Sequence, residues 1–463
     1  MARLLCFGAL ATVSLPFLYV LYVLFLKSPP PLPEFDYNAW WGPNELKAKQ
    51  DISVRNFKVQ FSAPMVNDLK ERLKNHRKWT PPLENIGFQY GFNTNQLDSW
   101  VQYWAEKYNF QEREKFFNKY PQFKTNIQGL DIHFIRVKPE VPAGVEVVPV
   151  LFLHGWPGSV REFYETLPLL TAVSKDRNFA IEAIVPSLPG YGFSDAAVRP
   201  GLGASEVAIV MRNLMQRLGF KKYYVEGGDW GGVIGADLVT LFPNEVLGFH
   251  TNLGFVMSNA ANLLNVIGNY FPSFVVESHL ADRMYPITKV FSYLVEESGY
   301  MHIQSTKPDT VGVAVADSPV GLLAYILEKF STWTKPEYKN ELDGGLAKHW
   351  TRDQLLDNLM CYWSTNSFTT SVRLYSETFN KRYFGLQLAE IPTPVPTWVV
   401  QAKNEISYQS PRQLRMKFKN LVHANPLEDG GHFLAFELPK VFAEDVLNAI
   451  TAFRKLKSQK TEL

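Results

Sequence analysis

The sequence predicts an α/β fold built on a mostly parallel sheet, with a helical insertion and an apolar N-terminal segment. Short apolar runs alternate with amphipathic stretches between residues 147 and 242, and the alternation returns between residues 395 and 456. This pattern is typical of parallel strands covered by helices on both faces. The region 260–385 interrupts it with a mostly helical pattern, and residues 4–26 form a dense apolar block.

The composition indicates a folded chain and excludes several functional classes. The 463 residues allow about two or three domains, or one large domain with insertions. Hydrophobic residues make up 46% and charged residues 20%, which excludes bulk disorder. The formal net charge of +2 and the lack of nucleic-acid-binding motifs argue against a nucleic-acid partner. Two cysteines exclude a disulfide framework and a Cys-rich zinc site.

The apolar block is predicted to anchor the chain in a membrane. Residues 4–26 carry no charged side chain, and a helix of that length spans about 34 Å, enough to cross a hydrocarbon core. A cleaved signal peptide is the alternative, but its apolar region is about 7–15 residues and small residues follow it. Here Lys27 and a run of prolines follow. Arg3 and Lys27 leave the orientation open, and the scarcity of cysteine favours a cytosolic body.

The remaining elements follow from hydrophobic periodicity and turn residues. A Pro-rich strap over residues 28–43 ends in Trp40-Trp41-Gly42-Pro43, and Gln128-Gly129 indicates a hairpin turn. The expected elements are helices near 64–78 and 100–108; hairpin strands 123–127 and 130–137; strand 147–153, helical stretch 160–171, strand 180–185, helix 205–218 capped by Ser205, strand 222–226 and helix 231–242; then strands 395–402 and 420–424 and helix 438–456.

A sharp turn between a strand and a helix is predicted to carry the chemistry. Strand 222–226 runs into Gly227-Gly228-Asp229-Trp230-Gly231-Gly232, the small-x-nucleophile-x-small pattern of a nucleophile elbow. Glycines allow the backbone to turn sharply and present one side chain. Because Asp229 is a carboxylate rather than a hydroxyl, it suits attack on an sp³ carbon and formation of an alkyl ester. Alternatively, Asp229 merely caps the helix after a glycine-rich turn.

A second turn is predicted to supply backbone hydrogen-bond donors. His154-Gly155-Trp156-Pro157-Gly158 directly follows strand 147–153. A loop in this position can aim a backbone N–H at a developing oxyanion. The predicted oxyanion hole consists of the N–H groups of Trp156 and Trp230, and His154 is interpreted as a structural residue of the turn.

The general base and its acid partner are expected late in the chain, because folds with such an elbow run in the order nucleophile, acid, histidine. Only His423 and His432 are late enough, and His423 lies inside a predicted strand. His432 follows two glycines in a loop and is the predicted base. Glu405, just after strand 395–402, is the predicted acid that orients it. Asp429 is the alternative acid, but it would have to fold back onto His432.

Taken together, these motifs resemble those of epoxide hydrolases of the microsomal type, which have the α/β-hydrolase fold. The resemblance covers nearly the whole chain and is carried by His154-Gly155-Trp156-Pro157, Pro189-Gly190-Tyr191-Gly192-Phe193-Ser194, Gly228-Asp229-Trp230-Gly231, the strap and the N-terminal block. Within that branch the chain is most similar to the insect juvenile hormone epoxide hydrolases.

The resemblance implies further residues and a reaction. Tyr300 and Tyr375 match the two lid tyrosines that donate protons to the epoxide oxygen. The implied reaction opens a lipophilic epoxide, juvenile hormone for this branch, into a diol through an ester on Asp229, with water activated by His432 and no metal or organic cofactor. Water and the membrane are the other expected partners, and the oligomeric state stays open.

The resemblance also implies a domain layout and a location. Residues 1–27 would be a membrane anchor, 28–120 a strap and helical cover, 121–259 and 386–463 the hydrolase core, and 260–385 a helical lid. The expected location is the endoplasmic reticulum membrane, with a single-pass anchor and a cytosolic body. The alternatives are a haloalkane dehalogenase-like hydrolase, which would share the Asp elbow but need halide donors, and a non-catalytic carrier of a lipophilic hormone.

Overall fold

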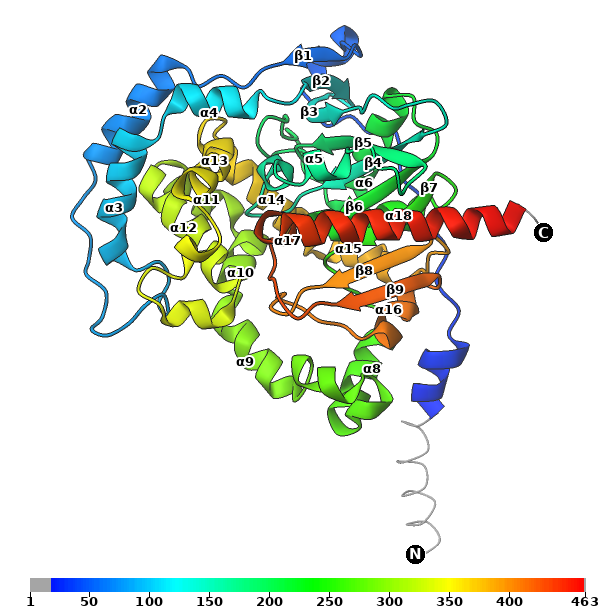
Figure 1. The fold of residues 1–463 in the computed structure, drawn as a ribbon. Coiled ribbons are helices and arrows are strands. Elements are labelled where there is room, and N and C mark those ends of the chain that lie inside the picture. Colours follow the sequence, from blue (N-terminus) through cyan, green and yellow to red (C-terminus); the bar gives the residue numbers. More distant parts are fainter. Residues whose placement is uncertain (1–17, 462–463) are drawn as a thin grey trace, which may run out of the picture.

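Among residues 18–461, which the computed structural model describes, nine strands form one sheet in the order β1-β2-β3-β5-β4-β6-β7-β8-β9 (Figure 1). All pairs from β5 through β4 to β9 are parallel, while β1, β2 and β3 join one edge with antiparallel pairing. The mostly parallel sheet is therefore confirmed. The strands are β1 (Arg55–Phe57), β2 (Gln122–Ile127), β3 (Leu130–Val137), β4 (Glu146–Leu153), β5 (Phe179–Pro186), β6 (Tyr223–Gly227), β7 (Val246–Thr251), β8 (Thr397–Gln401) and β9 (Leu421–Pro426).

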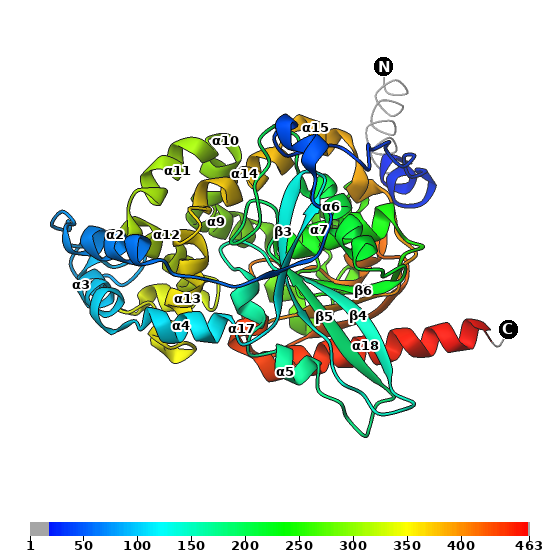
Figure 2. The ribbon, with the colours of Figure 1, turned by 90° about the horizontal axis from the view of Figure 1, so that it is seen from above.

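Helices cover both faces of the sheet, as Figure 2 shows from above. Helices α6 (Ala204–Arg217) and α7 (Trp230–Leu241) lie on one face, and α5 (Leu167–Leu170) and α18 (Pro439–Thr461) lie on the other. Every residue of β5 and β6 is buried, as expected of central parallel strands. The shorter helices α16 (Pro411–Lys417) and α17 (Leu434–Glu437) complete the C-terminal half. Loops that follow the parallel strands meet at one edge of the sheet, where ligands bind in such folds.

Two local predictions were wrong. The first residue of α6 is Ala204 and its N-cap is Gly203, not Ser205; the Glu206 carboxylate accepts the Gly203 N–H and the Ser205 hydroxyl, so Ser205 is a donor inside the first turn and not a cap. The helix expected over 160–171 is broken into a short 3₁₀ turn, η5 (Val160–Phe163), and the four-residue α5. Pro168 stands at the start of α5, where a proline suits a new helix rather than a continuing one.

A helical insertion lies between β7 and β8. Its helices pack mainly on one another and stand to one side of the sheet (Figure 1). They are α8 (Asn259–Tyr270), α9 (Ile287–Glu297), α10 (Gly299–Thr306), α11 (Pro308–Ala316), α12 (Pro319–Thr332), α13 (Arg352–Trp363), α14 (Phe368–Thr378) and α15 (Lys381–Gly385). The expected mostly helical character of residues 260–385 is thus observed.

An N-terminal helical segment covers the outer side of this insertion. It comprises α2 (Ala63–Lys74), α3 (Leu97–Gln102) and α4 (Phe110–Phe117), which pack near α12 and α13. The buried Asp357 carboxylate on α13 accepts hydrogen bonds from Tyr108 and Arg113 of this segment and from Arg161 of the core. Because Asp357 is fully buried, its charge needs these partners, and it fastens three parts of the chain together.

The segment before β1 runs along the hairpin of β2 and β3. The Trp41 N–H donates to the Gln128 carbonyl at 2.8 Å, and a Cβ on Gly42 would stand 2.0 Å from the Gly129 carbonyl oxygen. The predicted membrane segment falls largely outside the described residues. Within residues 18–461, no single helix is long and apolar enough to cross a membrane. Only the pair α11 and α12, taken together, has the required length and composition, and the two helices are bent by 116° relative to each other.

Candidate active site

The turn between β6 and α7 holds Asp229 in an uncommon backbone conformation. Asp229 has φ 49° and ψ −125°, stands at the N-cap of α7, and makes no side-chain capping hydrogen bond there. A non-glycine residue at positive φ stores strain that surrounding structure must impose. The close approach of neighbouring backbone imposes it: a Cβ on Gly231 would lie 2.0 Å from the Leu153 carbonyl oxygen. The geometry therefore supports an elbow rather than a capping aspartate.

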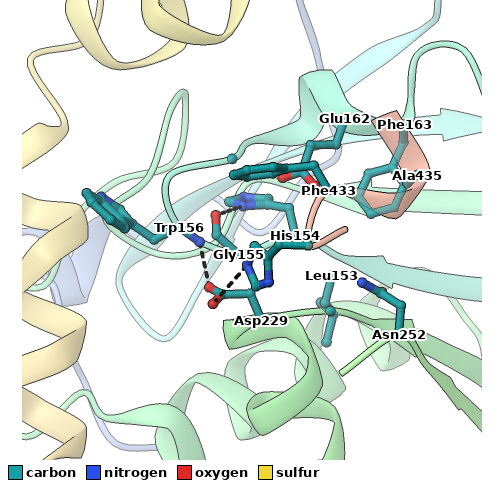
Figure 3. A pocket seen from close by; sticks show the side chains of 13 residues that line it. Leu153, His154, Gly155, Trp156, Glu162, Phe163, Asp229, Asn252, Phe433 and Ala435 are labelled. Atoms are coloured by element: carbon teal, nitrogen blue, oxygen red, sulfur yellow. Dashed lines mark hydrogen bonds and ion pairs between the residues drawn. The ribbon is translucent and has the colours of Figure 1, made fainter. Parts of the chain in front are cut away.

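Two partners from separate loops contact the Asp229 carboxylate (Figure 3). The Trp156 N–H donates to Oδ1 at 2.8 Å, and His432 Nε2 lies 3.4 Å from Oδ2. The loop after β4 can come this close because Gly155 has no side chain; a Cβ there would stand 2.3 Å from Asp229 Cβ. The two carboxylate oxygens thus differ: one is held by a backbone donor and the other faces an imidazole.

His432 is held in a loop between β9 and α17. Its Nδ1 lies 2.6 Å from Glu405 Oε1, and Glu405 follows β8, as expected. The rival acid Asp429 is exposed and makes no described contact with His432, while His423 lies on β9 with its ring against Trp398. Asp229, His432 and Glu405 therefore form a continuous line of contacts from three loops at the same sheet edge.

The electrostatics of this line favour a charged imidazole. Burial opposes the positive charge of His432, but Glu405 and Asp229 outweigh burial and raise the pKa of His432 well above its usual value. The two carboxylates therefore hold His432 in its protonated form while Asp229 is ionised.

Tyr300 and Tyr375 come from α10 and α14 of the insertion and meet above the elbow in an aromatic cluster. Tyr300 stacks on Trp156 with ring centroids 5.4 Å apart, and Tyr375 packs edge-on against Trp230 at 4.7 Å. The two tyrosine rings are 6.0 Å apart. Burial and the Asp229 charge raise the pKa of both hydroxyls well above the usual value, so both remain protonated donors. Trp333 joins the cluster and packs edge-on against His432 at 4.9 Å.

His154 has the structural contacts expected of it. Its Nε2 accepts the Leu188 N–H at 3.1 Å, and its Nδ1 lies 2.9 Å from the Gly155 carbonyl oxygen. Because Nε2 is an acceptor, the proton is assigned to Nδ1. Burial lowers the pKa of His154 to about 4, which fits a neutral ring that ties two loops together.

Three polar side chains near His432 received no role from the sequence: Glu437 and Glu162 were missed, and Asn252 was set aside because it is not a carboxylate. Glu437 accepts the N–H groups of Gly431 and Phe433 at 2.8 and 2.9 Å, so it holds the backbone on both sides of His432. Glu162 and Asn252 line a cavity together with Asp229 and His432, and Figure 3 shows both among the side chains around it. The only signal in the sequence was their position: Glu162 comes four residues after Gly158, and Asn252 directly follows β7.

The comparisons with known proteins agree with this geometry. Residues 54–163 match the family model described as epoxide hydrolase N terminus, and residues 148–275 match the model of the alpha/beta hydrolase fold. Across residues 18–461, no cluster of three or more His, Cys, Asp or Glu side chains is arranged to hold a metal ion.

Relatives extend the match over nearly the full chain. The sequence is 62% identical to juvenile hormone epoxide hydrolase of Bombyx mori over 97% of this chain and 99% of that protein. It is 42% identical to epoxide hydrolase 1 of Sus scrofa over 88% of this chain and 91% of that protein. The crystal structure of the Bombyx mori enzyme superposes with a TM-score of 0.91 at 63% identity, covering 91% of this chain and all of the other. The Aspergillus niger epoxide hydrolase superposes with a TM-score of 0.71 at 26% identity, covering 89% of this chain and 99% of the other. The chain therefore belongs to the microsomal-type epoxide hydrolases, with the α/β-hydrolase fold.

Proposed function

We propose that this enzyme hydrolyses lipophilic epoxides through a covalent ester on Asp229, and that juvenile hormone is its physiological substrate. The observation that carries the mechanism is the line Glu405–His432–Asp229, with Tyr300 and Tyr375 on the side of the substrate. The aromatic cluster around the tyrosines suits an apolar epoxide, and the name of the Bombyx mori relative supports juvenile hormone.

In the first step, Asp229 Oδ2 attacks one epoxide carbon and the carbon–oxygen bond of the ring breaks. A tyrosine hydroxyl gives its proton to the departing oxygen, which becomes the first hydroxyl of the diol. The raised pKa values of Tyr300 and Tyr375 keep those protons available at neutral pH. Oδ1 stays with the Trp156 N–H and becomes the carbonyl oxygen of the ester.

Formation of the ester itself prepares His432 for the second step. The Asp229 charge helps to hold the proton on His432, and esterification removes that charge. The pKa of His432 then falls, so the imidazolium gives up a proton, which restores the tyrosine hydroxyl spent in the first step. The neutral imidazole then takes a proton from water while Glu405 steadies it. The resulting hydroxide attacks the ester carbonyl, and the N–H groups of Trp156 and Trp230 stabilise the oxyanion. When the acyl–oxygen bond breaks, the leaving oxygen takes the proton from His432, and the diol departs with an oxygen from Asp229. The new Asp229 carboxyl then gives its proton to His432, which restores the starting state.

The rest of the chain takes supporting roles in this proposal. Residues 260–385 act as a lid that carries both tyrosines, residues 28–120 form the strap and cover, and residues 121–259 and 386–463 form the catalytic core. Residues 1–27 tether the enzyme as a single-pass anchor in the endoplasmic reticulum membrane, with the catalytic body in the cytosol. The charge-free run of residues 4–26 supports this tether.

Trapping the ester tests the mechanism. In His432→Gln, ester formation should continue and ester hydrolysis should slow by about 10³-fold, because the general base is missing. Mass analysis of the peptide that contains Asp229 after one turnover on juvenile hormone should find the adduct. In water enriched in ¹⁸O, the wild-type diol of the first turnover should contain unlabelled oxygen from Asp229. Solvent label in the first-turnover diol, with no adduct in the variant, would instead mean direct hydration.

A further inference from the structure

Apolar side chains gather on the outer surface of α8, α9 and the short turn η6 (Pro272–Phe274) between them. We call this surface the lid face. Phe271, Phe291 and Val295 on it are each 66–67% exposed, which is unusual for three large apolar side chains on a single surface. The other members of the lid face are Val266, Tyr270, Phe274, Val290 and Leu294.

The lid face meets the end of the N-terminal apolar segment. Leu24, in η1 (Tyr22–Leu26), packs against the small buried cluster that includes Leu264 of α8 and Tyr285, and Ile287 at the start of α9 packs against the same cluster. Figure 1 accordingly shows η1 and α8 close together along the lower edge of the molecule. The described end of the charge-free run, η1, therefore lies beside α8 of the lid face.

The side chains of α9 differ in exposure. Tyr293 of α9 is partly buried, and burial, then the charges of Glu297 and Glu405, raise the pKa of its hydroxyl. Phe291, Leu294 and Val295 point outward from the same helix. Lys289 is exposed on α9, and the Arg412 guanidinium lies 4.7 Å from the Phe274 ring, so cations accompany the apolar surface. Apolar and aromatic side chains with accompanying cations are typical of helices that lie in a membrane interface.

We propose that the lid face rests on the lipid bilayer that holds the N-terminal segment, so that a substrate dissolved in the membrane enters beneath α9. This inference rests on the proposed membrane tether. We infer that a lipid surface covers the lid face, and not a second copy of the chain. The proposed membrane segment ends beside this face, so the bilayer that holds the segment is adjacent to it.

Fluorescence quenching in vesicles of zwitterionic and anionic phospholipid tests this surface. The full chain carries Cys6→Ser, while the buried Cys361 is kept, and an environment-sensitive dye is attached to Phe291→Cys. The matched control is Val313→Cys on α11, a side chain that is 73% exposed. A quencher carried by the lipid should quench the dye at 291 severalfold more than the dye at 313, and aqueous iodide should show the reverse.

Three outcomes would overturn the inference. Equal quenching at 291 and 313 in chains that float with the vesicles rejects the lid face alone. Protection of 291 from both quenchers, with a dimer mass in solution, assigns the surface to a second copy. Chains that do not float with vesicles reject the tether and the lid face together, while activity on a water-soluble epoxide would leave the proposed chemistry intact.

A separate observation concerns the water that the second step needs. A cavity of about 20 Å³, measured as the space open to the centre of a water molecule, lies against Asp229 and His432. This size suits about one water molecule. Glu162 and Asn252 line it, whereas Tyr300 and Tyr375 do not, so it lies away from the side where the epoxide would bind.

The Glu162 carboxylate fills the space that a side chain at position 158 would need, and that position is a glycine. A Cβ on Gly158 would stand 1.5 Å from Glu162 Oε1, so the glycine is what allows the carboxylate to reach the cavity. Burial raises the pKa of Glu162 to about 8; His432 opposes this shift and Asp229 adds to it, which is expected of groups that share one small space. Neither Glu162 nor Asn252 has a role in the steps described above.

We infer that Glu162, with Asn252 beside it, is a positioning residue that holds the hydrolytic water for His432. The inference rests on the proposed ester mechanism. Glu162→Gln should leave the rate of ester formation within about twofold and slow ester hydrolysis by about 10²-fold, since misplacing a reactant by about 1 Å has such an effect. Gly158→Ala, which displaces the carboxylate, should give the same split between the two rates.

Rapid-quench single turnovers, with mass analysis of the peptide containing Asp229, measure both rates. The control is Glu165→Gln, three residues along, whose carboxylate contacts Arg161 instead. Unchanged ester hydrolysis in Glu162→Gln, or an equal loss in both steps, rejects the role of Glu162 while the ester mechanism stands. Wild-type enzyme that forms no ester rejects the mechanism and this inference together.

Discussion

The hydrolase core and the helical insertion position their functional groups by different physical means. In the core, backbone contacts place Asp229: Gly155 and Gly231 leave no room for a side chain, and the aspartate is held at positive φ. In the insertion, ring packing places Tyr300 and Tyr375, with Trp156 and Trp230 of the core as their supports. A backbone turn tolerates little change, whereas packed rings can share a task, so substitutions in the two regions should have unequal effects.

The largest effect is expected where the core backbone is closest to the nucleophile. Gly155→Ala adds a Cβ that would stand 2.3 Å from Asp229 Cβ and Oδ1, so the carboxylate or the loop must move. Turnover should fall by about 10²-fold or more, with ester formation slowed. Single-turnover kinetics would measure this, and Gly385→Ala, where no atom lies within 4 Å of the added Cβ, is the control. A variant with wild-type ester formation would mean that the close approach does not position Asp229.

An intermediate effect is expected at the lid tyrosines, because each can partly replace the other. Tyr300→Phe or Tyr375→Phe alone should slow ester formation by about tenfold, and the double variant by about 10³-fold, as for removal of a whole oxyanion site. Ester hydrolysis should change little. Tyr325→Phe, whose ring packs against Trp156 at 6.0 Å, is a control from the same insertion. If each single variant slows ester formation as much as the double variant does, the two tyrosines act as one unit. The insertion would then tolerate substitution no better than the core.

The smallest effect is on stability, and it arises in the core. His250 on β7 lies 3.0 Å from Asp445 and 3.4 Å from Glu226. Burial opposes its charge, but these two carboxylates raise the pKa of His250 to about 9. Because the folded pKa exceeds the unfolded value of about 6.5, this stabilisation is complete below about pH 6.5 and is lost as the pH rises through about 9.

The corresponding loss in the free energy of unfolding is about 3 kcal/mol at most. Chemical denaturation of the full chain between pH 6 and pH 9.5 measures it. Glu162 and Glu437, whose pKa values burial raises to about 8, add losses of the same sign. His250→Asn should therefore flatten part of the slope rather than all of it. An identical slope in wild type and variant would show that His250 is not charged in the folded state.

Much of the core could be predicted from the sequence, since its signals are local. The elbow needs glycines next to Asp229, the base needs a loop after the last strand, and the acid needs a loop after the strand before it; each requirement is visible within a few residues. The predicted order of parallel strands and helices agrees with the structure for the same reason. Ser205 was a wrong cap because it lies inside the first turn and its hydroxyl donates to Glu206, which hydroxyl preference alone does not reveal.

Only the tertiary structure decided which distant residues surround the nucleophile. Tyr300 and Tyr375 were selected by resemblance, because 21 tyrosines give no local reason to choose two. Glu162 and Trp333 acquire their significance from a distant segment: Glu162 lines a cavity with His432, and the Trp333 carbonyl accepts the His432 N–H. Glu437 lies close to His432 in the sequence, but its hydrogen bonds to the N–H groups of Gly431 and Phe433 appear only once the loop is folded. The sequence by itself determined the parallel sheet and the turns that hold the proposed nucleophile, base and acid, because backbone turns depend on neighbouring residues. Packing between the insertion and the core decided the rest, since burial and ring contacts exist only once separate segments meet.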